Sequence, residues 1–221
     1  MARGFGAVNR PSGRIGAMTT TPAVHPVTPN DQDEVAGSLA RAFVDDPVWK
    51  WLTAGRHDRF AELSQDFFSV TIRHHTHLGG AWASEGNGAG ALWAPPNAWR
   101  TKPLEIMGLL RPSVRLFGTR TPTALSVLSS MEKKHPREPH WYLAVLGTDP
   151  QHQGKGHGSA VLQPVLDRCD LEGVPAYLES SKEANVPFYE RHGFQVTDTH
   201  DFPKGPRIWL MWRDPRPPAG A

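Results

Sequence analysis

The stretch "DPQHQGKGHGSAVL", Asp149–Leu162, decides the fold of this chain of 221 residues. It follows the apolar run "HWYLAVLGT" at 140–148 and opens the pattern "GSAVLQPVLDRCDLEG" at 158–173, which has apolar residues at helical spacing. We therefore predict a strand, a glycine-rich turn and a helix, in that order. The first turn of a helix leaves about four backbone N–H groups without a partner, and the helix dipole attracts an anion to them. This order of elements favours a phosphate site at the turn.

The glycines of the turn narrow the kind of phosphate ligand. Gly154, Gly156 and Gly158 remove Cβ atoms that would obstruct a close approach to the backbone. The dinucleotide fingerprint G-x-G-x-x-G fails because Ser159 stands at its last position, and the Walker pattern fails because no Lys-Ser or Lys-Thr follows a spaced glycine pair. The pattern that remains is Gln153-x-x-Gly156-x-Gly158.

This pattern resembles motif A of the GNAT superfamily of N-acetyltransferases, whose turn holds the diphosphate of acetyl-CoA. About thirty residues later "FYERHGF" at 188–194 resembles the tyrosine-bearing helix of the same superfamily. Residues 135–213 closely resemble the puromycin N-acetyltransferase group, whereas the N-terminal half agrees only in outline. The resemblance implies acetyl-CoA as cofactor and direct acetyl transfer to a primary amine of a small molecule, puromycin-like or another amine antibiotic or metabolite. A role in antibiotic resistance belongs to that expectation.

Other functions stay open at this stage. They are a non-catalytic acyl-CoA sensor, a general nucleotide-binding module and an acetyltransferase that acts on a protein amine. A sensor would bind acetyl-CoA without forming product. A nucleotide-binding module would not prefer the pantetheine-bearing cofactor.

The resemblance also implies the fold class. We expect an α/β fold, a single acyl-CoA N-acyltransferase domain at 23–214, with tails at 1–22 and 215–221. Its twisted sheet is expected to be mixed, mostly antiparallel, with six to seven strands flanked by helices and with central strands splayed to admit the cofactor. Met18 is an alternative start of translation.

Local patterns predict the other elements. The expected strands lie at 24–28, in a hairpin within 79–96, at 174–181, and in a terminal antiparallel pair at 194–201 and 207–214. The expected helices lie at 30–43, 45–52, 57–75 and 184–193, with two more within 103–134. Asn30 or Asp31 is expected to cap the first of these helices.

The resemblance carries cofactor roles onto particular positions. The backbone of Leu146, Gly147 and Thr148 is expected to pair with the pantetheine arm. The expected diphosphate cradle consists of Gln153, Gly154, Lys155, Gly156, His157, Gly158 and Ser159. Many members carry an asparagine seven residues before the tyrosine, where this chain has Lys182; Asn185 stands four residues before it and either caps the short helix or binds the cofactor.

Tyr189 matches the general acid of the superfamily, which would protonate the leaving thiolate; packing against the cofactor is the alternative. Glu179 is the candidate general base, with a water chain out of the cleft as the competing route for the proton. Cys169 lies too far along its helix to act as a covalent relay and is expected to be a buried thiol.

The acceptor pocket is expected to combine aromatic side chains with carboxylates. The candidates are Phe43, Asp45, Asp46, Trp49, Trp93, Trp141 and Tyr142. Carboxylates beside aromatic rings suit a cationic amine with an apolar body. The same aromatic residue types also dominate ordinary cores, so any single member has core packing as its alternative.

Composition excludes several other classes. The formal net charge is +2, without a long run of Lys or Arg, so we expect neither a nucleic-acid partner nor an anionic membrane. One cysteine allows no intramolecular disulfide. No apolar run approaches the ~20 residues of a membrane span, and no signal-peptide pattern opens the chain, so a cytoplasmic protein, monomeric or homodimeric, is expected. His74, His75 and His77 lack further ligands at metal spacing, and no metal site is predicted.

Overall fold

The computed structural model describes residues 21–100 and 103–216, so the predicted tails and Met18 lie almost entirely outside the described residues. Within these described residues, seven strands form one sheet in the order β1-β2-β3-β4-β5-β7-β6. The strands are β1 (Val24–Pro26), β2 (Ala81–Ser84), β3 (Ala89–Ala94), β4 (Trp141–Thr148), β5 (Ala176–Ser180), β6 (Gln195–Asp201) and β7 (Arg207–Arg213). Among these described strands β4 and β5 pair in parallel and the other neighbours pair antiparallel. The predicted sheet is confirmed.

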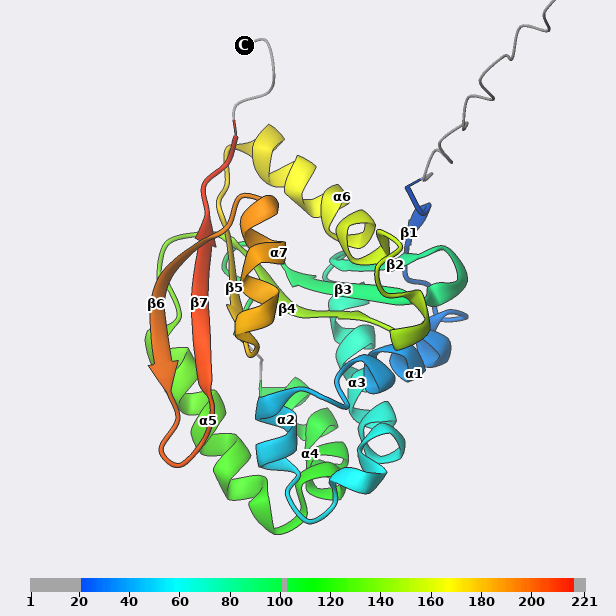
Figure 1. The fold of residues 1–221 in the computed structure, drawn as a ribbon, viewed down its shortest axis with the longest axis vertical. Helices are drawn as coiled ribbons and strands as arrows, with labels where there is room; N and C mark the ends of the chain where they lie inside the picture. The colour runs from blue at the N-terminus through cyan, green and yellow to red at the C-terminus, as the bar shows by residue number, and fades with distance from the viewer. Residues whose placement is uncertain (1–20, 101–102, 217–221) are drawn as a thin grey trace, which may run out of the picture.

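Helices cover both faces of the sheet, and the strands and helices predicted from the sequence are all present. The helices are α1 (Gln32–Ala42), α2 (Pro47–Leu52), α3 (Phe60–His77), α4 (Pro103–Phe117), α5 (Thr121–Lys134), α6 (His157–Glu172) and α7 (Val186–Arg191). Figure 1 shows α4 and α5 at the lower end of the molecule and α7 in front of β5. The domain is therefore a helix–sheet–helix arrangement.

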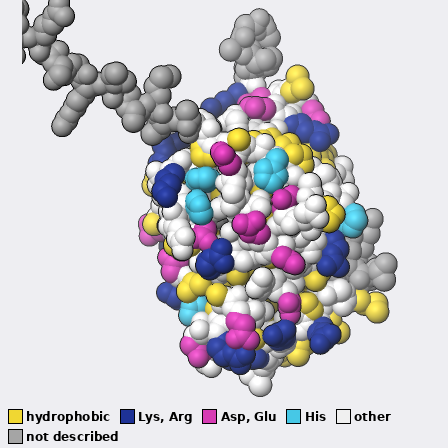
Figure 2. All heavy atoms as spheres, turned by 90° about the vertical axis from the view of Figure 1, so that its right-hand side faces the viewer, with side chains coloured by type: hydrophobic (Ala, Val, Ile, Leu, Met, Phe, Trp, Pro, Cys, Tyr) yellow, Lys and Arg dark blue, Asp and Glu magenta, His cyan; other side chains and the backbone are white. Residues whose placement is uncertain are grey.

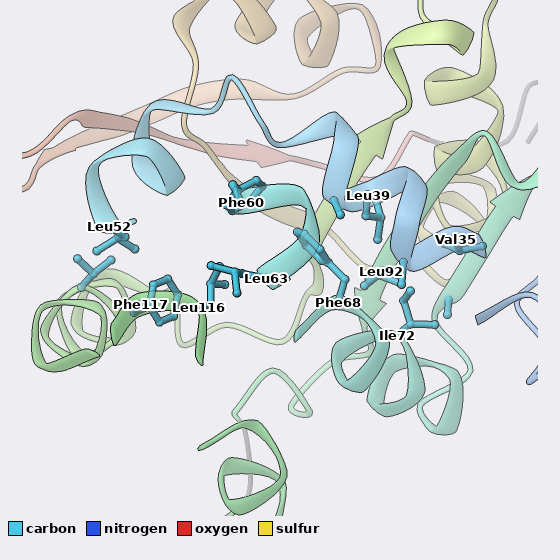
Figure 3. Packing of buried hydrophobic residues seen from close by; sticks show 14 of the residues in the cluster. Val35, Leu39, Leu52, Phe60, Leu63, Phe68, Ile72, Leu92, Leu116 and Phe117 are labelled. Carbon is cyan, nitrogen blue, oxygen red and sulfur yellow. The ribbon is translucent and has the colours of Figure 1, made fainter. Parts of the chain in front are cut away.

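One face of the sheet packs against α1 and α3. Val35 and Leu39 of α1 and Phe68 and Ile72 of α3 are fully buried, and they meet Leu92 of β3 in one cluster. Figure 3 shows these side chains pointing toward one another across the helices and the sheet. Burying each such side chain contributes about 1.5–3 kcal/mol, which explains why the apolar stripes of both helices face the sheet.

The start of α1 differs from the prediction in one detail. Asp31 occupies the N-cap position, but its side chain makes no capping hydrogen bond. Its carboxylate accepts hydrogen bonds from the N–H and the hydroxyl of Thr28. These bonds lower the pKa of Asp31 and hold the turn between β1 and α1. The predicted side-chain cap is therefore wrong, because the Asp31 carboxylate is turned back toward Thr28, which it contacts through Oδ2.

The other face packs against α6. Val161, Leu162, Val165 and Cys169 are buried against the sheet, as the helical spacing predicts. Pro164 lies inside the helix, which continues through it to Gly173. Pro164 is the eighth residue of the helix and has no N–H, so the carbonyl oxygen of Ala160 lacks its usual interior helical partner, and the helix continues past this missing bond.

The middle of the sheet opens between β4 and β5. The parallel pairing joins only Trp141–Leu143 with Ala176–Leu178. Beyond Leu143, β4 continues to Thr148 and stays paired with β3 on its other edge. Figure 1 shows β3 and β4 crossing the picture while β5, β7 and β6 run vertically, so the two halves of the sheet diverge. The predicted splay of the central strands is confirmed.

Candidate active site

A cavity of about 510 Å³ occupies the opening between β4 and β5. Its wall includes the free edge of β4, the turn before α6, the end of β5 and the start of α7. Of the residues singled out from the sequence, those that line it are Phe43, Asp46, Leu146, Gly147, Thr148, Gln153, Gly154, Gly156, His157, Gly158, Ser159, Glu179, Asn185 and Tyr189. Most of the predicted cofactor and catalytic residues therefore meet in one place.

The N-terminus of α6 forms one end of this cavity. Gly156 is the N-cap in the left-handed conformation, with φ of 87°, and Gly154 has φ of 73°. No side chain caps this helix within the described part of the chain, and the N–H of Ala160 donates to the carbonyl oxygen of Gly156 at 3.0 Å. The N–H groups of His157–Ser159 thus have no partner inside the helix. They form a ready site for an anion.

The floor beside these N–H groups is kept open by Gly158. A Cβ atom there would lie 3.2 Å from the hydroxyl oxygen of Thr148 and 3.6 Å from the ring of Phe188. Any longer side chain would fill the space between β4 and α7. The side-chain amide of Gln153 donates to the carbonyl oxygen of Thr148 at 3.1 Å and stabilises the turn.

Two predicted cofactor residues have different surroundings from those expected. The amine of Lys155 donates to the carbonyl oxygen of Gln151 at 2.8 Å, and Lys155 is absent from the cavity lining. Asn185 occupies the N-cap position of α7, but its side chain makes no capping hydrogen bond. Asn185 lines the cavity, and its cofactor role stays a prediction.

His157 also lines the cavity and is tied to the sheet. Its Nδ1 lies 2.9 Å from the hydroxyl oxygen of Ser84. Burial, with smaller contributions from His152 and Lys155, lowers the pKa of His157, so the ring is neutral at physiological pH. The contribution of this residue to an anion site is consequently its backbone N–H.

Tyr189 places a phenol in the cavity wall from α7. Only 7% of the residue is exposed. Burial, and then the negative charge of Asp46, raise the pKa of Tyr189 above its ordinary value. The hydroxyl therefore keeps its proton at neutral pH.

Asp46 joins two elements at the cavity wall. Its Oδ1 accepts hydrogen bonds from the N–H groups of Val48 and Trp49 and caps α2. Its Oδ2 accepts a hydrogen bond from the hydroxyl of Ser181, just after β5. Burial raises the pKa of Asp46 despite these bonds. Both oxygens are engaged, so Asp46 acts first as a structural bridge.

Glu179 lies on β5 with its side chain turned into the protein. Only 6% of that side chain is exposed, and its Oε1 lies 3.6 Å from Nδ1 of His135. Burial, followed by the negative charge of Glu179, raises the pKa of Tyr142 well above its ordinary value. The carboxylate of Glu179 therefore lies beside a buried imidazole at the cavity wall.

The residues predicted for the acceptor pocket separate into groups. Phe43 and Asp46 line the cavity. Asp45, Trp49 and Tyr142 do not line it. Asp45 forms an ion pair with Lys182, while Trp49 packs among the rings of Phe60, Phe67, Phe68 and Phe117. For Trp49 the core alternative therefore describes its surroundings.

Trp93 and Trp141 lie elsewhere. Both are almost completely buried, in the cluster that packs against α6. Alternation along a strand decides this: Leu92 and Tyr142 belong to the face of α1 and α3, so their neighbours Trp93 and Trp141 belong to the opposite face. The sequence motif located the strands but not which face of the sheet carries each ring.

Several cavity residues were missed by sequence reasoning. They are Ala42, Leu143, Ala144, Val145, His152, Leu178, Ser180, Ser181, Lys182, Phe188 and Arg191. Extending the strand edge backward from Leu146 would have found Ala144 and Val145. No local signal marks Ser181, because its partner Asp46 lies on another element.

The histidines at the end of α3 contribute no residue to this cavity. On the face shown in Figure 2, acidic and basic side chains are interspersed. His75 is buried and its Nδ1 lies 2.9 Å from the carbonyl oxygen of Thr71. Among the described residues no group of His, Cys, Asp or Glu has the geometry to hold a metal ion. In the same part of the chain, every helix is too short or too polar to cross a bilayer.

Comparison with known proteins gives the family. The acetyltransferase (GNAT) family model matches residues 38–194. A Schizosaccharomyces pombe protein named as an uncharacterised N-acetyltransferase is 31% identical over 209 residues, covering 86% of this chain and 82% of that protein.

Solved structures agree on the fold. A structure titled as histone acetyltransferase HPA2 and related acetyltransferase from Corynebacterium glutamicum has a TM-score of 0.68 at 23% identity, over 90% of this chain and 99% of that one. A mosquito arylalkylamine N-acetyltransferase-like structure has a TM-score of 0.62 at 13% identity, over 88% and 100%. With its splayed sheet, open helix terminus and matching family model, this chain belongs to the acetyltransferase (GNAT) family and is an N-acetyltransferase.

Proposed function

We propose that this enzyme transfers the acetyl group of acetyl-CoA directly to a primary amine of a small molecule. The observation that carries the proposal is one cavity that joins the open N-terminus of α6, the unpaired edge of β4 and the phenol of Tyr189. When bound, acetyl-CoA supplies an activated thioester. Holding two reactants in one cleft supplies a large part of the acceleration of such a transfer.

The residues present fit this cofactor. The N–H groups of His157–Ser159 would bind the diphosphate, because they lack partners within the helix and Gly158 leaves room before them. The edge of β4 at Leu146–Thr148 would bind the pantetheine arm through its main-chain groups, because β5 does not pair with it there.

Tyr189 would act as the general acid. Its raised pKa keeps the phenol protonated, and its hydroxyl would donate that proton to the sulfur of the leaving group. The ordinary pKa of a thiol is about 8.5, below that of the Tyr189 phenol. The phenol would therefore transfer its proton only within a direct hydrogen bond to the thiolate as it forms.

Glu179 would accept the proton of the acceptor ammonium. An amine is mostly protonated at neutral pH and attacks only after losing a proton. The carboxylate lies on β5 at the cavity wall and its side chain is largely withdrawn from solvent.

The acceptor end of the cavity favours a compact, cationic amine with an apolar body. Phe43 offers a ring there, while Asp46 and Glu179 place negative charge nearby. The solved neighbour titled arylalkylamine N-acetyltransferase like 5b supports a small-amine substrate class. The sequence likeness to the puromycin group over 135–213 makes puromycin-like aminoacyl nucleosides one member of the panel to test.

The decisive experiment is an amine panel with free CoA release as the readout. It includes puromycin, arylalkylamines, polyamines, aminoglycosides and a lysine-containing peptide, with mass spectrometry of the products. We expect acetylation of at least one small amine and none of the peptide. Binding of acetyl-CoA without any product would indicate a sensor, and preference for the peptide would indicate a protein substrate.

A further inference from the structure

A chain of three buried side chains leads away from the cavity. Oε1 of Glu179 lies 3.6 Å from Nδ1 of His135, and Nε2 of His135 lies 3.0 Å from Nε2 of His140. Nδ1 of His140 lies 2.6 Å from the carbonyl oxygen of Glu138. His135 is 8% exposed and His140 1%. Neither histidine contacts solvent freely, so their hydrogen bonds must be satisfied within the chain.

The contact between His140 and the carbonyl oxygen of Glu138 determines which nitrogen of each histidine ring carries the hydrogen. A carbonyl oxygen only accepts, so Nδ1 of His140 must carry a hydrogen. Burial lowers the pKa of His140, and the neutral ring then has a bare Nε2. That bare nitrogen must accept a hydrogen from Nε2 of His135. In its neutral form His135 therefore turns a bare Nδ1 toward Glu179.

The bare nitrogen changes what Glu179 faces. Two acceptors opposite each other repel when Glu179 is a carboxylate and His135 is neutral. One proton between Oε1 and Nδ1 removes this repulsion, either as a protonated Glu179 or as a cationic His135. A proton that reaches Glu179 from the cavity therefore has a second acceptor beside it, Nδ1 of His135 at 3.6 Å.

The described surroundings of the pair are mostly aromatic, with the Arg100 guanidinium 5.0 Å from the centroid of the Trp99 ring. The rings of Tyr142 and Tyr177 lie 4.7 and 4.9 Å from the His135 ring, and Trp99 stacks on it at 3.8 Å. Burial, and then Glu179, raise the pKa of Tyr177, with a smaller contribution from Asp198 on β6. Asp198 is paired with Lys134 of α5.

From this geometry we infer that His135 and His140 are positioning residues that make Glu179 the base: His140 fixes the tautomer of His135, and His135 shares with Glu179 the proton taken from the acceptor amine. The inference rests on the proposed function for the identity of the substrate. In the step itself the N–H bond of the ammonium breaks, its electron pair stays on the amine nitrogen, and the proton passes to Glu179 Oε and Nδ1 of His135. Solvent takes the proton after the product leaves.

The first test needs no activity. Nitrogen-15 NMR of the imidazole rings, recorded at about pH 9 where an ordinary histidine is neutral, reports which nitrogen of each ring carries the hydrogen. We expect the hydrogen of His140 on Nδ1 and that of His135 on Nε2. A hydrogen on Nε2 of His140, or on Nδ1 of neutral His135, would overturn the inference even if no substrate is ever found.

The second test compares variants on an active substrate. His140→Phe keeps an aromatic ring between Tyr177 and Trp212 but removes both nitrogens, so His135 is free to donate from Nδ1 to Glu179. We expect kcat to fall roughly ten-fold with KM for acetyl-CoA unchanged, and the acidic limb of the kcat profile to move to lower pH. His140→Gln serves if the phenylalanine variant does not fold, and His25→Asn on β1 is the control.

The outcomes separate the two proposals. Absence of turnover in the wild type contradicts the proposed function and leaves the NMR result to decide the tautomers. Normal turnover with an unchanged pH profile in His140→Phe contradicts the positioning role. A fall in stability with no movement of the pH profile likewise contradicts it, because a purely structural residue would behave in that way.

Discussion

The carboxylate of Asp46 accepts a hydrogen bond from the hydroxyl of Ser181, although the two residues lie 135 positions apart in the sequence. The same carboxylate caps α2 through the N–H groups of Val48 and Trp49. One buried side chain therefore ties the helix that opens the acceptor side to the end of β5, beside Tyr189.

Replacement of Asp46 separates its hydrogen bonds from its charge. Asp46→Asn keeps an acceptor for α2 and a donor for Ser181, so we expect nearly unchanged stability. Asp46→Ala removes the cap and is expected to lose about 0.5–2 kcal/mol. Urea unfolding measures both, and equal losses in the two variants would contradict this role.

The difference in stability between the wild type and Asp46→Asn should change with pH in a defined direction. The pKa of Asp46 is raised above the ordinary value of 3.8, so the folded protein holds the proton more tightly than the unfolded chain does. Stability from this group is greatest below pH 3.8 and decreases as pH rises through the folded pKa. The stability of Asp46→Asn relative to wild type is expected to increase over that window. A difference in the free energy of unfolding that stays constant with pH would contradict a raised pKa for Asp46.

Tyr189→Phe tests the general acid. The ring stays in the core against Phe194 and Phe188, so folding is expected to be unaffected. We expect kcat to fall by ~10²–10⁴-fold and the affinity for acetyl-CoA, measured by calorimetry, to change little. Turnover equal to wild type would remove the acid role.

The wild-type pH profile should carry the matching signature. Because the pKa of Tyr189 is raised above its ordinary value of 10.0, ionisation of this phenol should cause no loss of kcat below about pH 10. A descending limb near neutral pH that is present in wild type and absent in Tyr189→Phe would contradict the assignment.

Cys169 is expected to take no part in the reaction. Burial raises the pKa of its thiol to about 12, so almost no thiolate exists at neutral pH. Cys169→Ala should retain full kcat, and the folded wild type should resist thiol reagents until it is unfolded. Mass spectrometry after acid quench should detect no acetylated protein; an acetyl group on Cys169 would establish a covalent intermediate instead of direct transfer.

Two glycines at opposite ends of α6 distinguish binding from stability. Gly158→Ala places a methyl group 3.2 Å from the Thr148 hydroxyl, in the space before the free N–H groups, and should weaken acetyl-CoA binding. Stability should change by no more than about 1 kcal/mol, because alanine favours a helix. Gly173→Ala, at φ of 66° and with open space around it, should lower stability by about 1 kcal/mol without affecting binding. Parallel effects of both variants on binding would contradict the proposed diphosphate site.

The strand, the glycine-rich turn and the helix around 149–162 follow from the sequence because their residues are local, and hydrophobic periodicity and glycine chemistry are sufficient to predict them. Tyr189 was picked out by the resemblance of "FYERHGF" to the tyrosine-bearing helix of the superfamily, and the structure places it in the cavity wall.

The acceptor half did not follow, since it depends on contacts between distant elements. Trp93 was assigned to the pocket from its place on a hairpin, but strand alternation turns it toward α6. The contact between His135 and Glu179 joins two residues 44 positions apart, for which periodicity gives no signal. Aromatic composition alone does not distinguish a core ring from a binding ring.

The most direct measurement is a crystal structure of the enzyme with CoA bound. We predict diphosphate oxygens within hydrogen-bonding distance, about 2.7–3.2 Å, of the N–H groups at 157–159, with the pantetheine arm beside β4. A diphosphate bound elsewhere, or a turn whose carbonyl groups point toward the phosphates, would contradict the central claim.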